Sequence, residues 1–207
     1  MSHCILIPTI NQKQLLLNAL EWYVANTSTD IYVLDNGKQG LVSGTPRLKI
    51  FELEKPLGVA ASWNWLIKKA IKNGHENFLV LNDDIVLKKY PEEIDAIIED
   101  NKRIFFRPRP AFNWCVFILS KYIFETVGEF DEAFERCFYE DNDYEYRMKR
   151  FGFPIIFRDD LTPDVYNNSE STKANPLLGD FLGNREYYIQ KWGGLPTEEK
   201  YDTPFNK

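Results

Sequence analysis

Short apolar runs alternate with segments of helical periodicity through the first half of the chain. The runs are rich in Ile, Leu, Val and Phe, as buried strands are, and they cover residues 4–7, 31–34, 48–53 and 78–81. The segments that follow carry apolar residues at every third or fourth position, as on one face of a helix, and they cover residues 15–23, 59–71 and 91–100. Strands that alternate with helices predict an α/β fold with a mostly parallel central sheet flanked by helices. Such sheets bind their ligands at the carboxyl ends of the strands.

The second half of the chain has a less regular pattern. It predicts strands over 104–107, 115–120 and 155–157, a short helix over 121–127 and a longer helix over 140–151 that is closed by Gly152. Residues 159–175 are rich in Asp, Asn, Ser, Thr and Pro, which predicts a loop. A last helix is expected over 180–192.

Composition and charge exclude several classes of protein. The 207 residues fit one domain with a full hydrophobic core. The formal net charge is -6 and no run of Lys and Arg occurs, which argues against a nucleic-acid partner. Cys4, Cys115 and Cys137 are far apart and form no CxxC pair, so we expect reduced thiols. The chain has no signal-peptide pattern and no apolar stretch of the roughly 18 residues that a transmembrane segment needs, so we expect a cytoplasmic protein.

The most informative polar segment is Asn82-Asp83-Asp84, which directly follows the apolar run 78–81. Two carboxylates and an amide at the end of a strand can converge on one ligand, and hard oxygen groups of this kind suit Mg2+ or Mn2+. Asn and Asp are also common in ordinary solvated turns, because they bond to their own backbone. Taken alone, the triplet therefore leaves a metal site and a turn both open.

A second acidic group opens the helix predicted over 140–151. Carboxylates in a first turn are favoured by the helix dipole, and this explains Asp143 or Glu145 without any function. Glu140 and Asp141 follow an aromatic-rich approach that predicts partial burial, where unpaired carboxylates are costly. One of these two residues is therefore a candidate general base.

Taken together and in this order, six segments resemble the family 2 glycosyltransferases of the GT-A fold, and the resemblance runs from about residue 4 to about residue 157. The segments are Ile5-Leu6-Ile7-Pro8-Thr9, Tyr32-Val33-Leu34-Asp35-Asn36-Gly37, Pro56-Leu57-Gly58 with Ser62-Trp63-Asn64, Leu81-Asn82-Asp83-Asp84, Val127-Gly128-Glu129-Phe130-Asp131-Glu132-Ala133-Phe134, and the stretch from Phe138 to Arg147 that contains Glu140-Asp141. The fourth is similar to the metal motif called DXD, the fifth to the GGFDE segment and the sixth to the ED-containing helix of that family.

The resemblance implies a single Rossmann-like GT-A domain that transfers a sugar from a nucleoside-diphosphate sugar to a hydroxyl of a carbohydrate or glycoconjugate acceptor. By it, Asp84 would bind Mn2+ or Mg2+ and Asp83 would contact the ribose. The other nucleotide-binding residues would be Pro8, Thr9, Asp35, Asn36, Asn64 and Asn82. A uracil or thymine base is favoured. Asp141 would be the catalytic base, with Glu140 as the rival for that role. One catalytic carboxylate without a second as nucleophile implies direct displacement, with inversion at the anomeric carbon.

The chain departs from the family pattern at two points. The first position of the DXD-like motif is Asn82, and an amide is not an anionic metal ligand. Many members of the family also carry a metal-binding His after the last core strand, whereas this chain has only His3 and His75. Strict dependence on a metal is therefore open.

Two other functions stay open at this point. A catalytically decayed protein that binds a nucleotide-sugar or glycan would explain Asn82 and the missing His. A sugar nucleotidyltransferase would share the sheet and the acidic site, but it needs a Gly-rich basic loop after the first strand, and residues 8–11 contain no Gly. For the transferase we expect residues 1–158 to bind the donor and carry catalysis. Residues 159–207 would complete the acceptor side, and the chain could be one part of a larger polypeptide.

Overall fold

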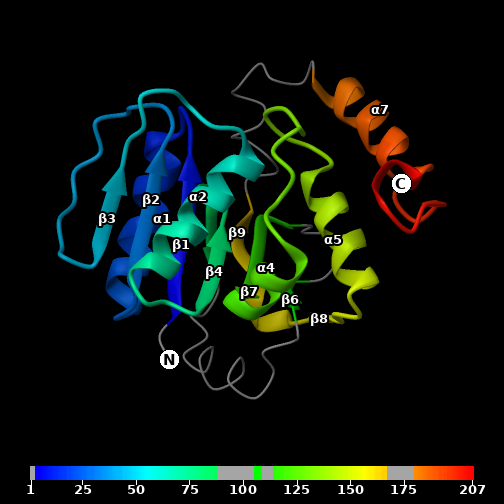
Figure 1. Cartoon of the computed structure of the whole chain (residues 1–207). Helices are drawn as coiled ribbons and strands as arrows, with labels where there is room; N and C mark the ends of the chain where they lie inside the picture. Colours follow the sequence, from blue (N-terminus) through cyan, green and yellow to red (C-terminus); the bar gives the residue numbers. More distant parts are fainter. Residues whose placement is uncertain (1–2, 88–104, 109–113, 167–179) are drawn as a thin grey trace.

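The computed structural model describes residues 3–87, 105–108, 114–166 and 180–207. Its centre is a seven-stranded sheet with the strand order β3-β2-β1-β4-β7-β6-β8 (Figure 1). The strands are β1 (His3–Thr9), β2 (Asp30–Asp35), β3 (Leu48–Phe51), β4 (Asn77–Leu81), β6 (Phe105–Arg107), β7 (Val116–Ser120) and β8 (Ile155–Phe157).

The first half of this sheet is parallel. Strand β1 pairs with β2 and β4, and β2 pairs with β3, all in the parallel sense. Strand β7 runs antiparallel to its neighbours β4 and β6, while β8 is parallel to β6. The predicted α/β class with a mostly parallel sheet is confirmed. The carboxyl ends of β1, β2 and β4 consequently lie side by side at one edge of the sheet.

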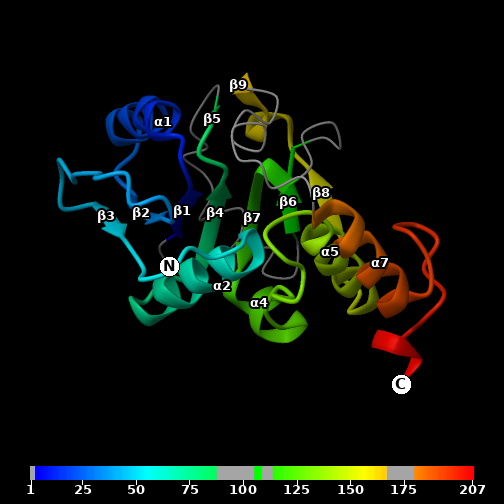
Figure 2. The same cartoon turned by 90° about the horizontal axis from the view of Figure 1, so that it is seen from above.

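Helices cover both faces of the sheet (Figure 2). Helix α1 (Lys13–Asn26) lies on one face, and α2 (Val59–Lys72), α4 (Lys121–Val127) and α5 (Glu140–Arg150) lie on the other. The apolar run of β1 serves both layers because successive side chains of a strand point to opposite faces. Ile5 and Ile7 belong to the core cluster with α1, and Cys4 and Leu6 belong to the cluster with α2.

An aromatic cluster joins α5 to the rest of the fold. The rings of Phe130 and Tyr144 are stacked, with centroids 3.9 Å apart, and the ring of Trp63 on α2 lies 5.0 Å from that of Phe130. All three side chains are buried. The cluster therefore fixes the position of α5 relative to α2.

Helix α7 (Asp180–Trp192) contacts α5 and the segment before it. The ammonium of Lys191 lies 2.6 Å from carboxylate oxygens of both Asp131 and Asp143. The indole N–H of Trp192 donates to Asp143, and the hydroxyl of Tyr187 donates to Asp131. Asp143 thus has a structural role, as predicted, but the role is to join α7 to α5 through Lys191 and Trp192. The last helix was correctly predicted over 180–192.

Some predictions need correction. The loop predicted over 159–175 is wrong for its first part, which contains η2 (Asp159–Leu161) and the strand β9 (Pro163–Tyr166). Strand β9 pairs antiparallel with β5 (Ile85–Leu87), which the sequence analysis also missed. Both strands are too short to show a period, and their pairing joins distant parts of the chain. The strand predicted over 48–53 ends at Phe51, and the helix predicted over 91–100 lies outside the described residues.

The segment after α7 folds back onto that helix and α5. The backbone N–H groups of Lys200 and Tyr201 donate to the carbonyl of Trp192, and the hydroxyl of Tyr146 donates to the carbonyl of Tyr201. A single 3-10 turn, η3 (Pro204–Asn206), follows. Among the described residues, no helix is both long and apolar enough to cross a membrane.

Candidate active site

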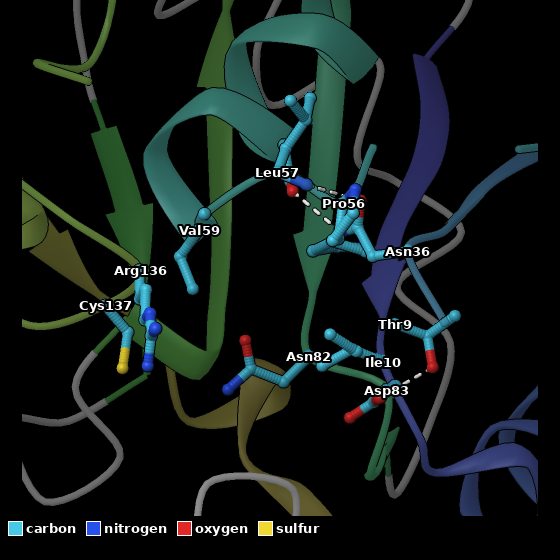
Figure 3. Close-up of a pocket in the computed structure, with 13 residues that line it drawn as sticks. Thr9, Ile10, Asn36, Pro56, Leu57, Val59, Asn82, Asp83, Arg136 and Cys137 are labelled. Atoms are coloured by element: carbon cyan, nitrogen blue, oxygen red, sulfur yellow. Dashed lines mark hydrogen bonds between the residues drawn. The ribbon is translucent and has the colours of Figure 1, made fainter. Parts of the chain in front are cut away.

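A pocket opens at the carboxyl ends of β1, β2 and β4, beside the start of α2 (Figure 3). Its volume is about 380 Å³. The residues that line it are Pro8, Thr9, Ile10, Asn36, Pro56, Leu57, Gly58, Val59, Ser62, Asn82, Asp83, Arg136 and Cys137. We call it the strand-end pocket. Five of the predicted nucleotide-binding residues line it, namely Pro8, Thr9, Asn36, Asn82 and Asp83.

A chain of hydrogen bonds links the three strand ends. The hydroxyl of Thr9, at the end of β1, donates to Asp83 Oδ2 over 2.7 Å and accepts from the side-chain amide of Gln39 over 3.2 Å. The same amide donates to Asp35 Oδ1 at the end of β2. Asp35 also accepts from the backbone N–H groups of Gly37 and Gln39. The pocket floor is therefore pre-organised by groups that lie far apart in the sequence.

Asn36 fixes the wall between β2 and α2. Its side-chain oxygen accepts from the backbone N–H of Leu57, and its side-chain amide donates to the hydroxyl of Ser62. Two loops and the first turn of α2 are therefore tied together by one side chain.

Five predicted site residues lie outside the lining of this pocket, namely Asp35, Asn64, Asp84, Glu140 and Asp141. Asp35 is buried behind the wall, where it holds the loop of Gly37 and Gln39. Asn64 is fully buried in α2. Its side-chain nitrogen donates to the carbonyl of Phe130, and its side-chain oxygen accepts from the N–H of Phe130. Asn64 therefore has a clear structural role in joining α2 to the segment before α5. Its predicted contact with a nucleotide stays a prediction.

Asp84, the predicted metal ligand, is also buried and also lies outside the lining. Burial, with the nearby charge of Asp84 as a second cause, raises the pKa of the Cys115 thiol to about 12. The charge of Asp84 therefore acts on the thiol of Cys115, outside the lining of the pocket.

The pair of Asp83 and Asp84 provides a limited set of ligands for a metal ion. Among the described residues, no group of three or more His, Cys, Asp and Glu side chains could hold one. Mg2+ in nucleotide enzymes is commonly bound by one or two carboxylates, with substrate phosphates and water completing its coordination. With Asp83 assigned to the ribose, Asp84 would be the one carboxylate ligand, and phosphate oxygens and water would complete the coordination of an ion held in that shared way.

Glu140 and Asp141 form the first turn of α5, after Tyr139, whose backbone is left-handed with φ 71°. Glu140 is 5% exposed, and its Oε2 has no hydrogen-bond partner within the described part of the chain. Burial, and then the charge of Asp141, raises the pKa of Glu140 well above the usual carboxyl range. An uncharged Glu140 is the form that such an environment favours.

Asp141 is half-buried as a residue, whereas Glu140 is buried. Burial raises its pKa, and the charge of Glu145 acts in the same direction. Backbone hydrogen bonds, first that from the N–H of Asn142, and then the charge of Arg107 lower the pKa of Asp141. The buried guanidinium of Arg107 also donates to Glu145 over 3.0 Å. Asp141 therefore has the character of a carboxylate base whose proton affinity is increased by its surroundings.

Sequence reasoning missed two residues of the site. Gln39 carries the hydrogen bonds between Thr9 and Asp35, and Arg136 lines the strand-end pocket. Gln39 lies in an irregular loop and gave no signal. Arg136 is a lone cation within an acidic stretch, and that contrast in charge was the available signal.

The sheet, its flanking helices and the pocket at the strand ends define the GT-A fold of glycosyltransferases. Three solved structures share it at low sequence identity. GalNAc-T7, solved with UDP, GalNAc and Mn2+, superposes with a TM-score of 0.68 and 11% identity over 93% of this chain and 48% of its own. The mannosyltransferase PcManGT of Pyrobaculum calidifontis, solved with GDP-Man and Mn2+, superposes with a TM-score of 0.60 and 12% identity. The match covers 83% of this chain and 59% of the mannosyltransferase. S. aureus TarS superposes with a TM-score of 0.58 and 13% identity, over 75% of this chain and 58% of the TarS chain.

A sequence relative agrees with that fold. The chain is 32% identical over 95 residues to a galactofuranosyl glycosyltransferase of Leishmania donovani. The aligned part is 46% of this chain and 20% of the relative, so this chain matches about a fifth of the relative's length. No family model matches the chain.

Proposed function

We propose that this chain is a glycosyltransferase that moves a sugar from a nucleoside-diphosphate sugar to a hydroxyl of a glycan or glycoconjugate. The observation that carries the proposal is the strand-end pocket, where Thr9 and Asp83 meet at the carboxyl ends of β1 and β4. The 32% identity to a galactofuranosyl glycosyltransferase supports a hexosyl donor, and a deoxyhexosyl donor is the alternative. Residues 1–158 bind the donor, and residues 159–207 complete the acceptor side.

The nucleotide occupies the strand-end pocket. Thr9 and Asn36 line its nucleoside end, and Asp83 accepts hydrogen bonds from the ribose while Thr9 holds the carboxylate in place. Asp35 supports the β2 loop through its bonds to Gly37 and Gln39, and the family resemblance favours a uracil or thymine base. A volume of about 380 Å³ is in the range of small-molecule sites.

Asp141 removes the proton from the acceptor hydroxyl. The acceptor oxygen forms a bond to the anomeric carbon while the bond from that carbon to the diphosphate oxygen breaks, so the configuration inverts and the nucleoside diphosphate leaves. The proton passes to Asp141. A protonated Glu140 leaves Asp141 as the ionised carboxylate of the pair.

A divalent ion, Mn2+ or Mg2+, would be held by Asp84 together with the diphosphate, and it would supply positive charge to the departing phosphate oxygens. Asp83 remains with the ribose in this assignment. Asn82 leaves the protein with fewer anionic ligands than an all-Asp motif, so we expect a weakly held ion.

The proposal is tested by incubating the protein with UDP-, dTDP- and GDP-sugars, in Mn2+, Mg2+ or EDTA, and measuring the release of nucleoside diphosphate. We expect slow hydrolysis of one donor class, faster with metal. Asp141→Asn should bind that donor as the wild type does and lose turnover by about 10²–10⁴-fold. Glu21→Gln, on the exposed face of α1 and away from the strand-end pocket, is the control for loss of a surface carboxylate and should keep full activity.

Other outcomes separate the alternatives. Donor binding without any turnover in the presence of acceptor sugars would support the decayed binder. Release of pyrophosphate from a nucleoside triphosphate and a sugar 1-phosphate would support the nucleotidyltransferase. Full turnover by Asp141→Asn would move the role of base to another group.

A further inference from the structure

One buried amide on α7 holds the loop that enters the strand-end pocket. The side-chain oxygen of Asn184 accepts from the backbone N–H of Glu135 over 3.0 Å. Its amide nitrogen lies 2.8, 2.9 and 3.1 Å from the carbonyl oxygens of Glu135, Cys137 and Phe138. Asn184 is 3% exposed, so these bonds are shielded from water. A single side chain thus determines the backbone path on both sides of Arg136.

The loop needs such support because its backbone is strained. Arg136, Phe138 and Tyr139 all have positive φ, at 56°, 84° and 71°. A residue with a side chain pays roughly 1–2 kcal/mol for the left-handed conformation, and three of them within four positions persist only when their surroundings hold them. The hydrogen bonds of Asn184 are the contacts that do so from the side of α7.

The opposite side of the loop rests on the first turn of α2. The backbone N–H of Val59 donates to the carbonyl of Arg136 over 2.6 Å. Gly58 allows this approach, because a Cβ at that position would lie 3.1 Å from the backbone of Arg136. The backbone at Arg136 is therefore held between α2 and α7, and Figure 3 shows Arg136 at the same pocket as Asn82 and Asp83.

The negative charges of the site favour a cation beside the strand-end pocket. Asp83 and Asp84 contribute two carboxylates at the end of β4, and a donor diphosphate brings further negative charge. Asn82 removes one anionic metal ligand, which weakens the hold on a bridging ion. A guanidinium offers several N–H donors in a planar fork that matches phosphate oxygens, and the positive end of the α2 dipole lies beside it.

We propose that Arg136 binds the diphosphate of the donor and stabilises it as it leaves, and that Asn184 is the positioning residue that holds Arg136 there. This inference rests on the proposed nucleotide-sugar function and adds a protein cation to it. The sequence pattern did not single out either residue. The C-terminal helix α7 consequently contributes to donor binding as well as to the acceptor side.

The test compares binding of a nucleoside diphosphate with binding of the matching nucleoside, by calorimetry at one ionic strength. Arg136→Gln should weaken nucleoside diphosphate binding about tenfold or more and leave nucleoside binding unchanged, because only the diphosphate contacts the guanidinium. Arg136→Lys should give an intermediate affinity. Lys72→Ala, an exposed cation at the far end of α2, is the matched control for loss of positive charge and should bind as the wild type does.

Asn184→Ala tests the positioning role through coupling. It should weaken diphosphate binding in the wild-type background and cause no further loss when combined with Arg136→Gln, whereas a general folding defect would add to the loss and would also weaken the nucleoside. Equal diphosphate affinity of wild type and Arg136→Gln overturns the inference and leaves the proposed function standing. Failure of the wild type to bind any nucleoside diphosphate overturns both.

Discussion

The hydroxyl of Thr9 donates a 2.7 Å hydrogen bond to Oδ2 of Asp83, across 74 positions of sequence and between the ends of β1 and β4. Both side chains are buried at the base of the strand-end pocket. The bond fixes the rotamer of a carboxylate that we assign to the ribose. Strand pairing brings the two residues together, because β1 and β4 are neighbours in the parallel sheet.

Replacing Thr9 with Val should therefore weaken donor binding. Without this bond Asp83 loses the partner that orients it for the donor. The bond contributes at most about 1.5–3 kcal/mol, so we expect KM for the donor to rise by up to about 10–100-fold, with a smaller change in kcat. Steady-state kinetics of donor hydrolysis measure this. Thr9→Ser keeps the hydroxyl and should stay close to wild type, and an unchanged KM in Thr9→Val would remove Thr9 from the donor site.

Asn64 should matter for stability more than for nucleotide binding. Asn64→Ala leaves the buried backbone N–H and carbonyl of Phe130 without their partner, which costs about 2–4 kcal/mol in the free energy of unfolding. Urea unfolding measures the loss. Undiminished stability together with a large loss of donor affinity would instead restore the nucleotide contact that the sequence predicted.

Glu140 should make stability depend on pH. Its pKa is raised in the folded state by burial and by Asp141, so the folded protein holds the proton more tightly than the unfolded chain does. Stability therefore falls as pH rises from the ordinary Glu pKa of about 4.3 through the raised value.

Glu140→Gln mimics the protonated form and removes this loss. The variant should be more stable than wild type at pH 8, with the difference shrinking toward pH 4, as measured by urea unfolding at both values. A difference of the same size at both pH values would show that Glu140 does not titrate in this way.

The part of the site that the sequence predicted is the part that directly follows strands. Thr9 and Asp83 each end or follow an apolar run, and a parallel sheet brings such ends together whatever the rest of the chain does. Gln39 and Arg136 lie in irregular loops, where the backbone path depends on tertiary contacts such as those of Asn184. No local pattern reports such contacts. The partner strands β5 and β9 were missed for a similar reason, since a run of three or four residues has no readable period.

The central claim is that the strand-end pocket binds a nucleoside-diphosphate sugar, and Asn82 offers the most direct test. Its side chain is exposed in the pocket wall, so Asn82→Trp fills the pocket with little effect on the fold. Asn18→Trp, on the exposed face of α1, is the matched control.

The measurement is calorimetric titration of the three proteins with UDP-, dTDP- and GDP-sugars in the presence of Mn2+. We predict one-to-one binding of at least one donor to the wild type and to Asn18→Trp, and its loss in Asn82→Trp. Binding that survives unchanged in Asn82→Trp, or no binding of any donor to the wild type, would contradict the assignment of this pocket.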